Sequence, residues 1–231
     1  FSYAESVRSF ATDNRLDATI DTGAITQKIL VGVDYRRVSN VASFNFVPAG
    51  TLDAFNPVYN PADAQDIGYP FAYNNQLLKQ TGIYAQDQVK FGDLFVTLGG
   101  RYDWVRVNDR NAGTTSKQHK FTYRVGVNYI TDSGIAPYLS YATSFEPVLG
   151  TDSITHEAFK PSSVKQWEGG VKFDARGLPD DVKLFATIAA FDIREANFVS
   201  PQVTVTPIFT TQGGTVEVYG GEIELVARIR E

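Results

Sequence analysis

The chain has 231 residues, with 21 Lys and Arg against 26 Asp and Glu, and a formal net charge of −5. A negative chain without a basic stripe argues against nucleic acid as a partner. The sequence has no Cys, which excludes disulfides, thiolate metal ligands and a cysteine nucleophile. It also has no Met, not even an initiating one, so we expect a fragment that is cut at both ends.

Alternation typical of strands begins close to the first residue. Apolar and polar residues alternate from about 5 to 21 and again from 26 to 38, with Gly23 in a tight turn between them. A stretch rich in Pro, Asn, Asp and Ala follows from about 43 to 75. A connection of that length is uncommon unless it is functional or disordered. We expect two strands and then a long loop.

The stretch from 80 to 107 has the clearest pattern of a hairpin. Its second half places Leu98, Tyr102 and Trp104 on one parity, and Arg101 and Asp103 on the other. Because successive side chains of a strand point to opposite faces, this predicts one apolar and one polar face. The alternation runs for more than about ten residues, roughly twice the usual soluble strand. It predicts a membrane-spanning hairpin with lipid on its apolar side.

Five further strands are predicted, at about 120–129, 137–145, 164–173, 183–193 and a last one that ends with 220–231. The short connections lie near 21–24, 91–93, 131–134 and 175–180. The longer ones lie near 43–75, 108–118, 150–161 and 200–207. Short turns at one rim and long loops at the other are typical of an outer-membrane barrel. Bacterial barrels have an even number of strands and must close, so nine predicted strands indicate part of a larger barrel.

The expected fold class is all-β, an antiparallel transmembrane β-barrel segment of about nine strands. No stretch approaches the roughly twenty apolar residues of a transmembrane helix. Aromatic residues make up 13% of the chain, which suits a barrel with aromatic rings at the membrane surfaces. The strands of a soluble β-sandwich also alternate apolar and polar residues, but nothing in that fold places short turns at one end and long loops at the other. The outward rows of Tyr, Val and Phe also argue against a fold that is exposed to water on that side.

Six segments carry a resemblance to a known family: QTGIYAQDQ (Gln80–Gln88), VTLGGRYDW (Val96–Trp104), YRVGVNY (Tyr123–Tyr129), PYLSYATSFEP (Pro137–Pro147), KPSSVKQWEGGVKF (Lys160–Phe173) and GGEIELVA (Gly220–Ala227). Together they resemble the ferrichrome-type hydroxamate siderophore receptors, a branch of the TonB-dependent outer-membrane transporters. Their order and spacing fit essentially the whole chain. The resemblance implies a barrel of about 22 strands, occluded by an N-terminal plug that carries the TonB box. Residues 1–231 would be the middle of that barrel, without the plug.

The resemblance also implies a function in the bacterial outer membrane. The whole receptor would import a ferric siderophore by TonB-coupled active transport, as a monomer with the TonB complex and membrane lipid as partners. The siderophore carries the iron, so no cofactor and no enzymatic activity are expected. A passive porin, or a TonB-dependent receptor for another substrate, remains the alternative.

Aromatic residues near the predicted long-loop rim are the candidate substrate contacts, because the family is expected to bind its chelate in an aromatic-lined pocket. Aromatic faces bury large areas at little entropic cost. The candidates are Phe44, Phe46, Phe55, Tyr59, Phe71, Tyr73 and Phe121. Packing within the loops or an aromatic girdle is the alternative for each, and the parity of Phe121 points outward.

Charged residues on the predicted polar parity are candidates for lining the lumen and facing the plug. They are Asp34, Arg36, Arg101, Asp103, Arg124, Glu168, Lys172, Asp192, Arg194, Glu222 and Glu224. The alternative is a simple polar lining in which opposite charges on neighbouring strands pair modestly. Two carboxylates on one face resemble a glycosidase pair, but a period of two places Glu222 and Glu224 together by default.

Two other groups are predicted to have no ligand role. His119 and His156, both in predicted loops, are too few for a metal site, which needs three or four ligands. An interfacial or lipid-facing aromatic belt is expected from Tyr35, Tyr102, Trp104, Tyr141, Phe145 and Trp167.

Overall fold

The computed structural model describes residues 2–45, 55–57, 72–111, 113–148, 150, 152, 154–155, 157–179, 182–202 and 209–229. The elements are all strands: β1 (Ser2–Asp21), β2 (Ile25–Asn45), β3 (Ala72–Phe91), β4 (Leu94–Asp109), β5 (Thr114–Tyr129), β6 (Ile135–Glu146), β7 (Ser162–Asp174), β8 (Val182–Ala196), β9 (Val199–Gln202), β10 (Phe209–Gln212) and β11 (Thr215–Ile229). Within these ranges no helix is long and apolar enough to cross a membrane. The predicted all-β class is confirmed.

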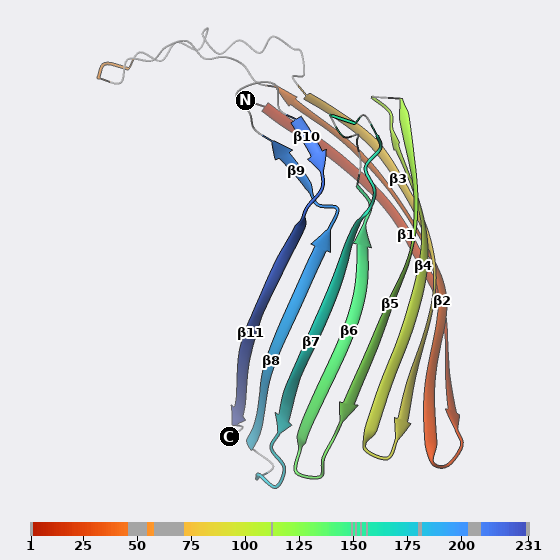
Figure 1. Cartoon of the computed structure of the whole chain (residues 1–231), viewed down its shortest axis with the longest axis vertical. Helices are drawn as coiled ribbons and strands as arrows, with labels where there is room; N and C mark the ends of the chain where they lie inside the picture. Colours follow the sequence, from red (N-terminus) through yellow and green to blue (C-terminus); the bar gives the residue numbers. More distant parts are fainter. Residues whose placement is uncertain are drawn as a thin grey trace. The chain divides into compact units, whose positions relative to one another are not determined.

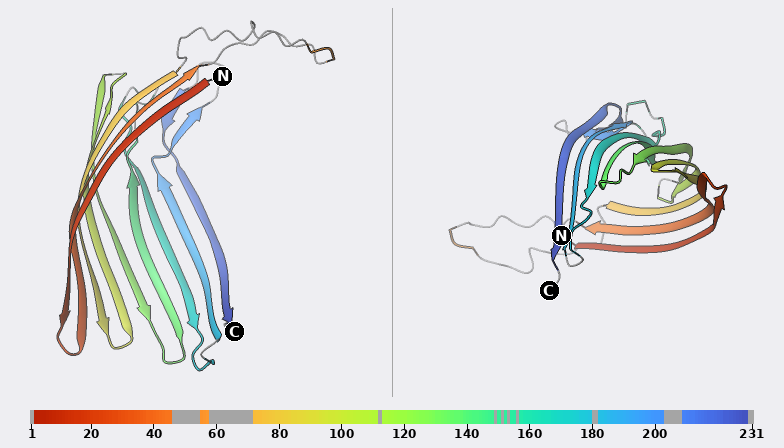
Figure 2. Two further views of the ribbon diagram at one scale, coloured as in Figure 1. Left: turned by 180° about the vertical axis from the view of Figure 1, so that it is seen from behind. Right: turned by 90° about the horizontal axis from the view of Figure 1, so that it is seen from below.

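Nine strands form one sheet in the order β1-β2-β3-β4-β5-β6-β7-β8-β11, as Figures 1 and 2 show. The pairs β5–β6, β6–β7, β7–β8 and β8–β11 are antiparallel. The two short strands β9 and β10 pair with each other in a separate antiparallel hairpin. Strands that are consecutive in the sheet are thus also consecutive in sequence from β1 to β8, and the predicted number of nine strands is confirmed.

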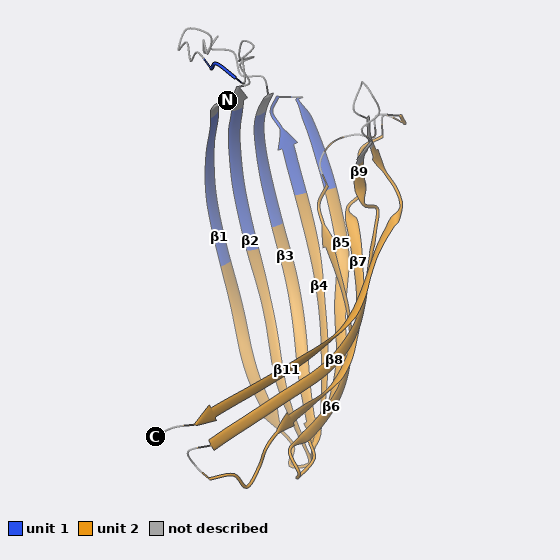
Figure 3. Ribbon diagram, turned by 90° about the vertical axis from the view of Figure 1, so that its left-hand side faces the viewer, with its two compact units in different colours: residues 1–12, 35–80, 106–117 blue, residues 13–34, 81–105, 118–231 orange. Residues whose placement is uncertain are grey.

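Contacts between residues divide the chain into two units (Figure 3). Unit 1 comprises residues 1–12, 35–80 and 106–117, and unit 2 comprises 13–34, 81–105 and 118–231. In unit 2 the turns after β1, β3, β5 and β7 lie at the same edge of the sheet (Figure 1). At the first of them, Gly23 has a φ of 85° and its N–H donates to the Asp21 carboxylate over 2.9 Å. These are the four short connections that the sequence predicts.

Three predicted loops include residues that the structure places in strands. The loop expected at 108–118 is shorter, because β4 continues to Asp109 and β5 begins at Thr114. The stretch expected as a loop at 200–207 includes the last three residues of β9, 200–202. Backbone pairing continues here although apolar alternation fades, since interstrand hydrogen bonds do not require an apolar face. The predicted loop at 43–75 also narrows, because β2 ends at Asn45 and β3 begins at Ala72.

Few described side chains are buried, which is the consequence of a single-layer sheet. The buried apolar residues are Leu77, Val105, Val107, Ala136, Phe159 and Ala189. Large apolar side chains such as Leu16, Leu139, Ile188 and Ile223 are instead exposed on one face. A soluble sheet would cover such a row with a second layer, whereas lipid covers it in a membrane barrel.

Candidate functional site

The sheet register places the predicted lumen charges on one face, which we call the polar face. Tyr138 pairs with Gly170, and Gly170 and Glu222 both pair with Ala189, so these four residues share a face. Arg124 pairs with Ala142 on the same side of β6 as Tyr138. Alternation along each strand, together with the contacts given below, assigns the remaining members of this face. The polar face comprises Asp34, Arg36, Arg101, Asp103, Arg124, Glu168, Lys172, Glu222 and Glu224. Their role in lining a lumen stays a prediction.

Arg101 on β4 is the centre of an ion-pair cluster on this face, which we call the Arg101 cluster. Its Nε and Nη2 donate to the Asp103 carboxylate over 2.7 and 2.6 Å. Its Nη1 and Nη2 also donate to Asp34 on β2, the second over 2.9 Å. The Asp103 side chain is only 2% exposed. A guanidinium shared between two carboxylates has few donors left for a ligand anion, so this cluster cross-links strands.

The Arg101 cluster crosses β3 at a glycine. A Cβ placed on Gly82 would overlap the Arg101 guanidinium and lie 2.8 Å from Asp103 Oδ1. Only a residue without a side chain lets Arg101 lie flat over β3 and reach Asp34 on the strand beyond. The glycine in this strand is therefore explained by close approach and not by a turn.

Two further side chains cross one strand at a glycine in the same way. Tyr84 on β3 lies over Gly32 on β2, and its hydroxyl donates to Asp13 on β1 over 2.6 Å. Arg124 on β5 lies over Gly99 on β4 and donates to Gln86 on β3. A Cβ on Gly99 would be 3.1 Å from Arg124 Cγ. Together with Arg101, these bridges tie β1 to β5 on the polar face.

Glu168 and Lys172 on β7 surround Tyr138 on β6. The Tyr138 hydroxyl donates to Glu168 Oε1 over 2.7 Å, and Gln166 Nε2 donates to Glu168 Oε2 over 3.2 Å. The Lys172 Nζ lies 4.9 Å from the centre of the Tyr138 ring. The carboxylate thus has both oxygens engaged, which suits a fixed polar lining better than acid–base chemistry.

The remaining predicted lining residues are less tightly held. Arg36 Nη2 lies 3.4 Å from Gln80 Oε1, at the limit of a hydrogen bond. Glu222 pairs in register with Ala189, and Glu224 with Thr187. Their common face follows from the strand period, as expected, and the residues opposite them on β8 carry no charge.

The prediction that Asp192 and Arg194 belong to the polar face is wrong. Asp192 pairs with Trp167, and Arg194 pairs with Lys165, so both lie on the opposite face. There Arg194 Nε donates to Asp192 over 3.0 Å, and its Nη2 lies 2.8 Å from Glu217. Parity alone assigned them incorrectly because polar residues occur on both faces near the end of β8.

Aromatic rings form a belt on the face opposite the polar face, within unit 2. Ring centres are separated by 4.7 Å for Tyr102–Trp104, 5.7 Å for Tyr123–Tyr141 and 4.6 Å for Tyr141–Trp167. Such a row across adjacent strands is typical of the aromatic girdle at a membrane surface. In unit 1, Tyr35 lies 6.4 Å from Phe10, while Phe145 pairs in register with Ser163 in unit 2.

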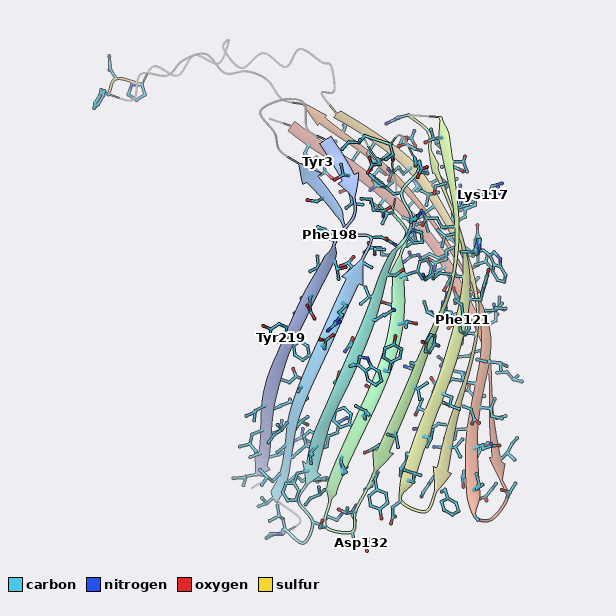
Figure 4. The ribbon with its side chains drawn as sticks, in the orientation of Figure 1. Tyr3, Lys117, Phe121, Asp132, Phe198 and Tyr219 are labelled. Carbon is cyan, nitrogen blue, oxygen red and sulfur yellow. The ribbon has the colours of Figure 1, made fainter. Side chains whose placement is uncertain are left out.

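Phe121, predicted both as a substrate contact and as outward-pointing, lies with this belt (Figure 4). Its ring stacks on Tyr123 at 6.0 Å and it is 56% exposed. Its neighbour on β4 is Gly100, and a Cβ placed on Gly100 would lie 3.2 Å from the Phe121 ring. A position on the lipid-facing side argues against contact with a chelate in the lumen.

Of the other predicted substrate contacts, the structure describes only the side chain of Phe55. Phe55 is 99% exposed. Phe46, Tyr59 and Phe71 lie outside the described residues, and so do the side chains of Phe44 and Tyr73. These assignments stay predictions.

Of the two histidines, only His119 lies among the described residues. His119 lies on β5, not in a loop as predicted, and its ring stacks on Tyr102 at 6.1 Å. His156 is outside the described residues. Among the described residues no group of three or more His, Cys, Asp or Glu could hold a metal ion.

Sequence reasoning missed a hydrogen-bonded cluster at the end of the sheet opposite the tight turns of unit 2. It joins the β6–β7 connection to the β9–β10 hairpin through Asp152, Asn197 and Gln212. Gln118 on β5 adds to it, because its Nε2 donates to the Val148 carbonyl over 2.8 Å. Neither periodicity nor charge marks these residues; Asp152 and Asn197 are residue types common in turns, which is the only available signal.

The chain is similar to several known outer-membrane receptors. It is 37% identical to the ferrichrome outer membrane transporter/phage receptor of Escherichia coli strain K12, over 97% of the chain and 31% of that protein. It is 32% identical to the ferrioxamine B receptor of Salmonella typhimurium, over 98% of the chain and 32% of that protein. The chain thus spans about a third of the length of these relatives.

Solved structures share the fold. Pseudomonas aeruginosa FpvA bound to heterologous pyoverdines aligns with a TM-score of 0.75 at 21% identity, over 96% of the chain and 30% of FpvA. The ferric-catecholate import receptor Fiu of Escherichia coli K12 aligns with a TM-score of 0.70 at 21% identity, over 96% of the chain and 35% of Fiu. The family model described as TonB dependent receptor-like, beta-barrel matches residues 1–230. The chain belongs to the TonB-dependent receptor β-barrel family of the bacterial outer membrane.

Proposed function

We propose that the protein to which this chain belongs imports a ferric siderophore across the outer membrane by TonB-coupled active transport. The observation that carries the proposal is the 37% identity over 97% of the chain to a ferrichrome transporter. A second relative of similar identity is a ferrioxamine B receptor, and the names of both relatives indicate siderophores with hydroxamate groups. We therefore assign a ferrichrome-like hydroxamate siderophore as the substrate class.

The faces of the sheet suit a barrel wall around a water-filled lumen. The apolar face and its aromatic belt would contact lipid. The polar face would line the interior, where an N-terminal plug and the TonB complex are the expected partners. The residues 1–231 would form one partial barrel domain, with the connection between β2 and β3 on the extracellular side, and the receptor would act as a monomer. Iron is cargo bound by the siderophore, so we propose no protein cofactor and no catalytic activity.

Growth of iron-starved cells tests this proposal. The full-length gene is expressed in a strain without hydroxamate receptors, and ferrichrome or ferrioxamine B is the only iron source. We expect growth that is lost when the TonB box is deleted, because energised import requires TonB. The matched control is the same strain with an empty vector.

The results also separate the alternatives. Growth on a different iron chelate alone, with the same dependence on the TonB box, would support TonB-coupled import but show that the assigned substrate class is wrong. Uptake of small solutes that does not depend on TonB would favour a passive porin and would refute the proposal.

A further inference from the structure

The ladder between β5 and β6 covers only part of either strand. It runs from the pair Arg124–Ala142 to the pair Asn128–Tyr138, five residues of each strand, although β5 has 16 residues and β6 has 12. β6 stays paired with β7 beyond this ladder, as far as Glu146 at its end. From Arg124 toward the start of β5, the strands β5 and β6 therefore part, at a point that we call the fork.

One side chain closes the fork in place of backbone pairing. The Thr143 hydroxyl accepts a hydrogen bond from the Tyr123 N–H over 2.8 Å and donates to the Tyr123 carbonyl over 3.2 Å. In a regular antiparallel ladder, the main chain of Thr143 would make both of these bonds. The hydroxyl thus satisfies the first backbone groups that the ladder leaves unpaired, and it holds the two strands together where they part.

The fork lies at the level of the aromatic belt. Tyr123 belongs to the belt, and its ring centre lies 5.7 Å from that of Tyr141, which is inside the β5–β6 ladder. Lipid cannot satisfy free backbone N–H and carbonyl groups, whereas water can. The ladder thus continues where lipid covers the sheet and ends where water begins. The parted ends of the strands can therefore move without exposing unpaired backbone groups to lipid.

Beyond the fork, Gln118 ties β5 to both ends of the β6–β7 connection. Its Nε2 donates to the Val148 carbonyl over 2.8 Å and to the Phe159 carbonyl over 3.3 Å. Gln118 is 8% exposed and Phe159 is 6% exposed. The Phe159 N–H in turn donates to the Gly150 carbonyl over 3.1 Å. A buried side chain thus takes over from the ladder in joining β5 to the β6–β7 pair.

On the polar face, the side chains beside the β5–β6 ladder lean away from it. Arg124 lies over Gly99 on β4, toward β3. Tyr138 leans the other way, because a Cβ on Gly170 of β7 would lie 2.9 Å from Tyr138 Cε1, and its hydroxyl donates to Glu168 on β7. These contacts brace β3–β5 and β6–β7 separately, on either side of the short ladder.

We propose that the fork is a joint at which the barrel wall opens, as the β6–β7 pair swings away from β5 at the end opposite the tight turns. Gln118 and Thr143 are the positioning residues that hold it shut. Opening breaks the side-chain hydrogen bonds of these two residues and leaves the backbone ladder intact. It widens the entrance through which the ferric chelate reaches the lumen, and this last step rests on the proposed function.

Distances between spin labels test the opening in the purified full-length receptor in lipid vesicles. Residues 1–231 contain no Cys, so labels are attached to introduced ones. The pair His119→Cys and Lys165→Cys spans the fork, because these exposed residues lie on β5 and β7. The control pair, Lys165→Cys and Tyr219→Cys, lies on β7 and β11. Gln118→Ala and Thr143→Val should shift the first distance to longer values and leave the second unchanged.

Matched variants separate the positioning role from general damage. Gln118→Ala and Thr143→Val each remove two hydrogen bonds, so the open form, and with it hydrogen exchange of the amides in 118–123, should increase about tenfold. Thr143→Ser keeps the hydroxyl and should behave as the wild type. Lys120→Ala, at the next position of the same parity on β5, is the control for Gln118→Ala and should change neither distance nor exchange.

The kinetics of ferrichrome binding to de-energised cells test the consequence for substrate entry. Because the chelate enters and leaves through the same opening, Gln118→Ala should raise the association and dissociation rates by a similar factor and leave the dissociation constant unchanged. Loss of a direct contact would instead raise mainly the dissociation rate. The two rates therefore distinguish an entrance from a ligand contact.

The wild-type receptor supplies a test that needs no variant. Amides in 118–123 should exchange faster than those in 164–173 of β7, which is paired on both sides. Equal exchange there, or unaltered distances in both Gln118→Ala and Thr143→Val, would overturn the opening of the fork. Longer distances with unaltered binding rates would overturn its role in substrate entry. A wild-type receptor that binds neither ferrichrome nor ferrioxamine B would refute the proposed function and leave the distance result standing.

Discussion

Replacing Arg101 with Ala should destabilise the barrel more than any other single change to the polar face of β2–β4. The substitution removes four hydrogen bonds to Asp34 and Asp103. Breaking a buried ion pair by removing one partner costs about 3–5 kcal/mol, whereas an exposed pair contributes about 0.2–1 kcal/mol. Asp103 is 2% exposed, but Arg101 and Asp34 are 32% and 21% exposed. We therefore expect the lower end of the buried range, a loss of about 3 kcal/mol.

Equilibrium unfolding of the full-length receptor in urea, followed by tryptophan fluorescence in lipid vesicles, measures this loss. Arg106→Ala is the matched control, because Arg106 has the other parity on β4 and is exposed. Gly82→Ala should destabilise the same cluster from β3, since its Cβ would overlap the Arg101 guanidinium. The changes should be less than additive when combined with Arg101→Ala. Equal unfolding curves for the Arg101 and Arg106 variants would refute the argument.

Two further predictions concern the faces of the sheet and the hydrogen bonds that hold the β9–β10 hairpin. Because the chain has no Cys, Leu98→Cys should react with a lipid-soluble maleimide and Thr97→Cys with a charged one; reversed labelling would contradict the assignment of faces. The Thr155 N–H and other backbone donors hold the pKa of Asp152 below its ordinary value of 3.8. The carboxylate accepts a hydrogen bond from the Gln212 N–H and so holds the hairpin to the β6–β7 connection. This contribution is fully present above pH 3.8 and is lost as the pH falls through the lowered pKa. Hydrogen exchange in the hairpin, corrected for its intrinsic rate, should be constant from about pH 7 to about pH 5 and rise in stronger acid. Asp152→Asn should abolish that dependence.

The sequence predicts which side of the sheet a residue occupies more successfully than which residue it touches. Parity alone placed Asp34, Arg101 and Asp103 on one face, because successive side chains of a strand alternate. It did not predict that Arg101 reaches Asp34 across β3. That contact depends on the register of three strands, and β2 and β3 are separated by a long connection. Gly82 could have signalled the crossing, since a glycine inside a strand often marks close approach.

The hydrogen-bonded cluster beside the β9–β10 hairpin was not predicted, for a different reason. Gln212, Asp152 and Asn197 act through hydrogen bonds between connections, which have no period that a sequence pattern can detect. The hairpin was missed because β9 and β10 have four residues each, too few to establish alternation. Its pairing is supported by contacts made far from it along the chain, and those contacts appear only when the strands are assembled.

The error at Asp192 and Arg194 shows how a parity argument must be anchored in a membrane protein. The apolar parity identifies the outward side only where lipid covers it. On β4, the residues just past Trp104 reverse the pattern, because Val105 is buried on the polar face while Arg106 is exposed on the other. The same reversal at the end of β8 puts charges outside. From the level of the aromatic belt, where Asp192 pairs with Trp167, water replaces lipid, so the outward face becomes the polar one. Parity therefore tells which side of the sheet a residue is on. Its position along the strand relative to the aromatic belt decides whether an apolar or a polar side chain is expected on the outward side.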